Sequence, residues 1–154
     1  RQRQMCIRDR SMYLTKRIKG KELLTFIPAQ ILGCLLGVML ANVFFEHSII
    51  ELSTKNRDGF HIFLSEIVAT FGLIFIIFAT LKDGKTTVAA CVATYISAGY
   101  WFTSSTSFAN PAVAIARTFT DSFTGINYLN TPTYIFAELL GAIAAVYIIK
   151  RLIK

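Results

Sequence analysis

Residues 103–119 read TSSTSFANPAVAIARTF, a segment too apolar for an ordinary loop and too short for a full membrane crossing. The helical run from Pro111 to Phe119 reaches only about 13 Å, whereas the apolar core of a bilayer is about 30 Å thick. Its start is well marked, because Asn110 suits the N-cap and Pro111 suits the first helical position, where its missing N–H is not needed. The sequence therefore predicts a half-helix that begins at residues 110–111.

The residues before this half-helix are small and polar. Non-helical backbone such as Thr103–Ala109 is tolerated at membrane depth only where it is buried in protein or lines a wet cavity. The hydroxyl groups therefore favour a water-filled lumen. The helix dipole would place about half a positive charge at Asn110, which repels cations, while the Asn110 amide can donate to a passing oxygen atom. The segment indicates a passage for neutral molecules.

Four other stretches are long and apolar enough to cross a bilayer, which needs roughly 20 residues. We place these spans near 24–45, 61–81, 86–103 and 134–149. The 154 residues have an apolar fraction of 54% and a mean hydropathy of +0.54, which exceed the values of most soluble domains. We expect an all-α transmembrane protein with four spanning helices and one re-entrant half-helix within 104–119.

Basic residues mark the edges of these spans. Apart from the four arginines of residues 1–10, nine basic residues fall on one predicted side, namely Lys16, Arg17, Lys19, Lys21, Lys82, Lys85, Lys150, Arg151 and Lys154, and only Lys55, Arg57 and Arg117 fall elsewhere. The positive-inside rule places the larger group in the cytoplasm. The net charge of +7 is not gathered on one face with interleaved aromatic residues, so we expect a lipid bilayer and no nucleic acid as partner.

The first ten residues, RQRQMCIRDR, have no helical or strand periodicity and resemble a translated sequencing adapter. We expect residues 1–10 to be a non-native junction. The natural protein would then begin upstream of Ser11.

An internal repeat links the first and last spans. Residues 26–33, FIPAQILG, are similar to residues 134–141, YIFAELLG. In the predicted topology the first copy runs outward and the second inward, which is the signature of inverted-repeat transport folds. Chance similarity between two apolar helices is the alternative, since apolar spans share few residue types.

A second clue is the motif Asn110-Pro111-Ala112, which follows a polar loop. It is similar to the second signature motif of the aquaporin and glycerol-facilitator family. Residues 65–71, SEIVATF, resemble the family helix that starts with Ala-Glu and continues with Gly-Thr-Phe, and residues 29–33 resemble its third helix. The resemblance implies that six spans and two half-helices form one pore, and that the full-length protein is a homotetramer. Residues 11–154 would form the C-terminal two-thirds of that channel domain, without the first Asn-Pro-Ala.

The resemblance also assigns a selectivity filter. Val113 stands where the family usually carries an arginine, and by spacing Ala98 and Ser107 take two other filter positions. Small and apolar side chains should widen the constriction, because selectivity depends on pore diameter and on the groups that line it. We therefore expect a permissive filter.

Val113 and the run 102–109, FTSSTSFA, resemble a bacterial subgroup associated with arsenic resistance. The resemblance implies passive permeation of water and small neutral solutes, such as glycerol-like molecules or arsenite, across a bacterial inner membrane.

Three ionisable residues accompany the motif. For Glu66 the resemblance implies that it accepts hydrogen bonds from the half-helix loop, with a proton relay as the alternative. Arg117, one helical turn past Val113, would either restore a filter cation or form a salt bridge, for example with Asp121, and we favour the salt bridge. Glu138 is expected to make a polar contact between helices.

Other classes of protein fit the sequence less well. An ion-coupled secondary transporter would need carboxylate ligands at the helix break, and a nonfunctional channel remnant is a further alternative. An intramembrane enzyme would need a nucleophile and base, but the serines of 104–107 have no histidine in the same half of the membrane. We expect no catalytic residue, cofactor or metal site, because His47, His61 and the cysteines lack the spacing of metal ligands.

Overall fold

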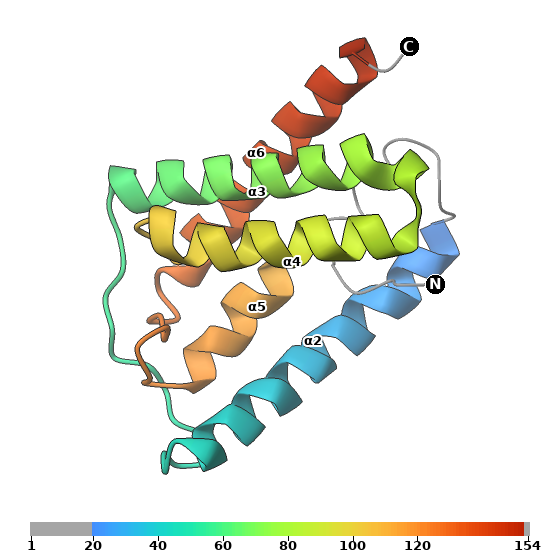
Figure 1. The fold of residues 1–154 in the computed structure, drawn as a ribbon. Helices are drawn as coiled ribbons and strands as arrows, with labels where there is room; N and C mark the ends of the chain where they lie inside the picture. The colour runs from blue at the N-terminus through green and yellow to red at the C-terminus, as the bar shows by residue number, and fades with distance from the viewer. Residues whose placement is uncertain (1–19, 153–154) are drawn as a thin grey trace.

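The structure, a computed structural model, describes the backbone of residues 20–152 and the side chains of residues 26–152. Its regular elements are helices: α2 (Gly20–Phe44), α3 (Phe60–Thr80), η1 (Leu81–Asp83), α4 (Lys85–Phe102), α5 (Pro111–Ala116), η2 (Arg117–Phe119) and α6 (Thr131–Leu152). Figure 1 shows their arrangement. The predicted junction at residues 1–10 lies outside the described residues.

Among the residues that the structure describes, three segments are long and apolar enough to cross a membrane: Phe26–Phe44, Phe60–Asp83 and Thr131–Leu152. They contain or closely overlap three of the four predicted spans. The fourth, near 86–103, forms α4 with nearly the expected bounds and a length of about 27 Å. It is not among the three, since threonine, serine and tyrosine residues dilute its apolar character. The prediction of four spans is therefore confirmed only in part.

The main core lies where α3 packs along α6. Its buried side chains come from both helices and include Ala69, Leu73, Ile77, Ala142, Ala145 and Val146. Gly141 brings the two backbones close together, because a Cβ atom there would lie 2.4 Å from the carbonyl oxygen of Ile67. This close approach makes α3 and α6 a firm frame for the segment between α4 and α6.

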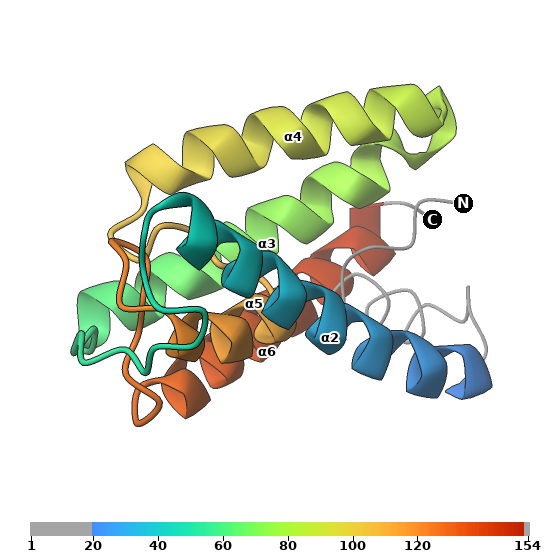
Figure 2. The same ribbon diagram turned by 90° about the horizontal axis from the view of Figure 1, so that it is seen from below.

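The helices run back and forth between two ends of the bundle. α2 and α6 run in opposite directions, as the internal repeat predicts (Figures 1 and 2). After α4 the chain turns back to the middle of the bundle, and α5 then runs from there toward the end it came from. α5 packs against α2 and α6. A short helix thus begins deep between longer ones.

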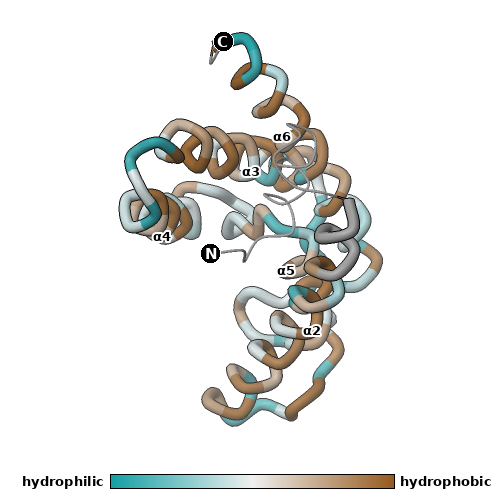
Figure 3. The backbone as a smooth tube through the Cα atoms, turned by 90° about the vertical axis from the view of Figure 1, so that its right-hand side faces the viewer, coloured by the Kyte–Doolittle hydropathy of each residue, from teal (hydrophilic) through white to brown (hydrophobic). Residues whose placement is uncertain are grey.

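Charged and apolar surfaces are separated along the bundle. Hydrophilic residues colour the α3–α4 turn and the C-terminal end of α6, while hydrophobic residues dominate the long helices (Figure 3). The turn carries Lys82 and Lys85, and α6 ends with Lys150 and Arg151. Large apolar side chains of α2, namely Leu32, Leu36 and Leu40, are exposed. Such a surface suits a bilayer.

Candidate functional site

The loop before α5 has an unusual backbone. Thr106, Ser107 and Ala109 have φ angles of 65°, 50° and 48°, in the left-handed region that residues with a side chain rarely adopt. Each such conformation costs roughly 1–2 kcal/mol. Strained residues of this kind persist only where surrounding contacts hold them. The loop therefore needs strong partners.

Two fully buried carboxyl groups supply them. Glu66 accepts hydrogen bonds from the backbone N–H groups of Phe108 and Ala109, each at 2.9 Å and each to a different oxygen. Glu138 accepts one from the N–H of Asn110, also at 2.9 Å. Three successive N–H groups thus converge on side chains of α3 and α6. The Glu66 contact is the one that the family resemblance implies.

Glu138 makes a contact that we did not predict, because its carboxyl oxygen accepts from the loop backbone. The expected polar contact between helices stays a prediction. The only signal in the sequence was an ionisable residue inside an apolar span, which indicates an interior partner without identifying it.

Asn110 caps α5 as its residue type predicts. Its side-chain oxygen accepts from the N–H of Ala112 at 3.2 Å, and its carbonyl oxygen accepts from those of Val113 and Ala114. Pro111 takes the first helical position. Asn110 and Ala112 are buried. Among the described residues the Asn110 amide nitrogen finds no acceptor, so its N–H donors are available to a molecule beside the helix start.

The helical run predicted over Pro111–Phe119 is present, but its last three residues wind more tightly than an α-helix. α5 stops at Ala116, and residues 117–119 continue as the tighter helix η2. The Thr118 hydroxyl donates to the carbonyl of Ile115 at 2.8 Å, which is the acceptor that the N–H of Phe119 would use in an α-helix. No further turn follows η2, because the carbonyls of Arg117 and Thr118, which residues 121 and 122 would need, accept from the N–H groups of Ile126 and Ser53.

The predicted filter residues do not share one cavity. Val113 lines a cavity of about 210 Å³ between α2 and α5, together with Cys34. Ser107 is buried against α4, where a Cβ atom on Gly99 would lie 2.8 Å from its hydroxyl oxygen. Ala98 lies on the exposed surface of α4, and neither it nor Ser107 lines the cavities described here. The filter assignment stays a prediction.

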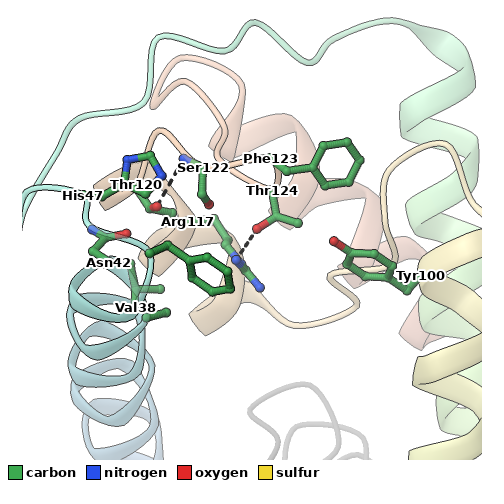
Figure 4. A pocket seen from close by; sticks show the side chains of 11 residues that line it. Val38, Asn42, His47, Tyr100, Arg117, Thr120, Ser122, Phe123 and Thr124 are labelled. Atoms are coloured by element: carbon green, nitrogen blue, oxygen red, sulfur yellow. Dashed lines mark hydrogen bonds between the residues drawn. The ribbon is translucent and has the colours of Figure 1, made fainter.

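A larger cavity of about 320 Å³ lies at the C-terminal end of α5, as Figure 4 shows. It is lined by polar and aromatic residues of α2, α4 and the segment after α5, including Asn42, Tyr100, Arg117 and Thr124. The Arg117 guanidinium donates a hydrogen bond to the Thr124 hydroxyl. Asn42, which the sequence did not single out, is buried and donates to the carbonyl of Phe119 at 3.0 Å.

Asp121 is not the partner of Arg117. Its carboxylate accepts from the backbone N–H of Thr54 at 3.0 Å and from the Ser53 hydroxyl at 3.2 Å, and it lies 3.5 Å from the Lys55 ammonium. The Thr54 N–H, followed by the Ser53 hydroxyl and the Lys55 charge, lowers the pKa of Asp121. The prediction of an Arg117–Asp121 pair is wrong, because the Asp121 carboxylate bonds to residues of the α2–α3 connector instead.

Among curated proteins, the aquaglyceroporin AqpS of Rhizobium meliloti (strain 1021) is 41% identical to the chain over 141 residues. The match covers 92% of this chain and 60% of AqpS, so the chain spans about three fifths of that relative's length. A match of this extent includes the loop and α5. No family model and no solved structure matches the chain.

Proposed function

Because the chain belongs to the aquaporin and glycerol-facilitator family, we propose that it forms part of a passive transmembrane channel for small neutral solutes. It is an integral membrane protein, with three helices apolar and long enough to span a bilayer. The observation that carries the proposal is the way Glu66 and Glu138 hold the loop, so that Asn110 and the start of α5 lie in the middle of the bundle.

The geometry supports a re-entrant half-helix. In our proposal α4 is a fourth span, and residues 104–119 enter the membrane and leave it on the same side. The amino end of α5, with Asn110, Pro111 and Ala112, then meets the pore at mid-depth. Its helix dipole and free amide donors favour a solute oxygen and disfavour a cation.

The proposed permeants rest on the filter that the family resemblance assigns. Its residues Val113, Ser107 and Ala98 are all small, and such a filter would leave room for molecules larger than water. We propose water, glycerol-like solutes and neutral metalloid hydroxides such as arsenite as cargo. The working unit would be a homotetramer in a bacterial inner membrane. Uptake should follow the solute gradient and be independent of sodium or proton gradients.

Stopped-flow light scattering of liposomes that contain the full-length protein tests this proposal. Gradients of water, glycerol and arsenite should each produce faster volume changes than in protein-free liposomes. Val113→Arg should narrow the passage and lower glycerol and arsenite uptake more than water flow. Volume changes equal to those of protein-free liposomes for all three would refute the channel, and passage of water alone would refute the permissive filter.

Two substitutions at Asn110 separate capping from conduction. Asn110→Asp keeps the oxygen that caps α5, whereas Asn110→Ala removes it and should lower stability by about 1 kcal/mol. Both remove the amide donors and should slow glycerol uptake. Unchanged uptake in Asn110→Asp would show that Asn110 does not face the pore.

A further inference from the structure

Val113 leaves the start of α5 without a cation, but two other guanidinium groups lie close by. The guanidinium carbon of Arg57 is 5.8 Å from the centroid of the Phe108 ring, and that of Arg117 is 6.0 Å from the same centroid. Arg57 belongs to the α2–α3 connector, whereas Arg117 directly follows α5. Two segments far apart in sequence therefore bring positive charge to the loop that precedes Asn110.

Neither guanidinium group is held in a salt bridge by the described residues. Within residues 26–152 no acidic group lies within salt-bridge distance of Arg57 or Arg117, since Asp121 pairs with Lys55. Their hydrogen-bond partners are neutral, the Thr124 hydroxyl for Arg117 and the Ser104 carbonyl at 3.4 Å for Arg57. A guanidinium group does not lose its proton in proteins. Both positive charges therefore persist, and contact with the Phe108 ring helps to hold them in place.

Arg117 is the better placed of the two to act on a solute. It lines both the cavity of about 320 Å³ and the cavity of about 210 Å³ that also contains Val113. Figure 4 shows its guanidinium group pointing into the space between α2 and α4, with Tyr100 on the other side. A fixed charge at a passage with low-dielectric walls acts strongly on ions, because such walls focus the field.

This inference rests on the proposed channel function. We propose that Arg117, assisted by Arg57, excludes permeating cations from this pore and so replaces a positively charged side chain at position 113. The half-helix start is then left wide by Val113, and the charge of Arg117 lies one helical turn later, directly after α5. A neutral solute can still accept hydrogen bonds from the guanidinium as it passes. Size selection and charge selection are thereby separated along the pore.

Two measurements on liposomes with the full-length protein test this inference. Glycerol uptake is followed by light scattering, and proton or sodium entry is followed with a trapped dye under an inside-negative potassium diffusion potential. Arg117→Ala should raise cation entry by about tenfold or more, the scale of one unit charge acting over a few ångströms. Arg117→Lys should keep cations out. Thr124→Asp, which neutralises Arg117 in place, should also admit cations.

Arg151→Ala is the matched control. Arg151 also contacts an aromatic ring, with its guanidinium carbon 4.6 Å from the Tyr147 centroid, but it lies near the C-terminal end of α6. Cation entry should be unchanged in this variant.

The outcomes separate the two proposals. If glycerol passes but Arg117→Ala, Thr124→Asp and the double variant Arg57→Ala/Arg117→Ala all remain closed to cations, the role of the arginines is overturned. If the unmodified protein passes no neutral solute, the proposed channel function fails instead. Should Arg117→Ala not assemble in the membrane, Thr124→Asp decides the question, because it leaves Arg117 in place.

Discussion

Glu66 accepts two hydrogen bonds from the backbone of the loop before α5, whereas Glu138 accepts one. Each Glu66 oxygen accepts one backbone N–H from residues that precede Asn110, and one of these residues, Ala109, has a left-handed backbone. The carboxyl group thus offsets local strain with two hydrogen bonds in a dry environment, where such bonds are strong and an unpaired N–H is costly.

Glu66→Gln tests this role at the scale of one residue. The amide replaces one acceptor oxygen by a donor, which would then face a backbone N–H. We expect a loss of about 2–3 kcal/mol in stability and slower glycerol uptake. The midpoint of thermal unfolding in detergent measures the first effect. Ser65→Ala is the control, since its hydroxyl bond to Ser104 is exposed and should matter little. Equal midpoints for Glu66→Gln and Ser65→Ala would contradict this account.

At the scale of elements, the crossing of α3 and α6 positions both carboxyl groups. Gly141 lies one turn after Glu138 and allows this crossing, because any side chain there would meet the Ile67 carbonyl. Helices that approach so closely cannot shift without moving Glu66 and Glu138 relative to the loop. The site is therefore built on two rigid elements and not on the loop itself.

Gly141→Ala should push α6 away from α3. Overpacking of this kind costs about 1–3 kcal/mol. Gly33→Ala is the matched control, since no other heavy atom lies within 4 Å of a Cβ built at Gly33, and alanine is the better helix former. Thermal unfolding should show a lower midpoint for Gly141→Ala and an equal or higher one for Gly33→Ala. A midpoint for Gly141→Ala at or above that of the unmodified protein would argue against tight packing here.

At the scale of the whole molecule, the α2–α3 connector is tied to the segment that follows α5. Backbone hydrogen bonds join Ser53 to Thr118 and Asn127 to Lys55, and the Asp121 carboxylate bonds to Thr54. These contacts cover the end of α5 and hold Arg117 beside Thr124. The ionic contact between Asp121 and Lys55 is one of these contacts, and it makes the stability of the protein depend on pH.

The pH dependence has a definite sign. The pKa of Asp121 is lowered in the folded state, so its contribution is present above the ordinary aspartate pKa of about 3.9 and is lost as the pH falls through the lower folded value. Asp121→Asn should therefore reduce the unfolding midpoint at pH 6 and have a smaller effect near pH 3. A constant difference between the two proteins across this range would exclude the carboxylate as the cause.

The proposed orientation can be tested by labelling. With the cysteines of the protein replaced by serine, Asn56→Cys in the connector should react with an impermeant thiol reagent applied outside intact cells. Lys82→Cys in the α3–α4 turn should react only after permeabilisation, because the positive-inside rule places that turn in the cytoplasm. Both positions are exposed. Labelling of both from the same side would rule out this topology.

Local properties of the chain were enough to predict several features. Capping preference and the fixed φ of proline placed the start of α5 at Asn110-Pro111, and apolar runs located α2, α3 and α6. These features depend on a residue and its near neighbours, so they can be read along the chain. The family resemblance added the contact between Glu66 and the loop.

Other features depend on how helices distant in sequence are oriented. Glu138 accepts a hydrogen bond from Asn110, which is 28 residues away in sequence. Asp121 accepts one from Thr54, which is 67 residues away, and therefore does not pair with Arg117. The convergence of Arg57 and Arg117 on Phe108 has the same origin. Residue type predicts that a buried carboxyl or guanidinium group needs a hydrogen-bond partner. The identity of that partner is determined by the helix crossing angles and loop paths of the folded chain.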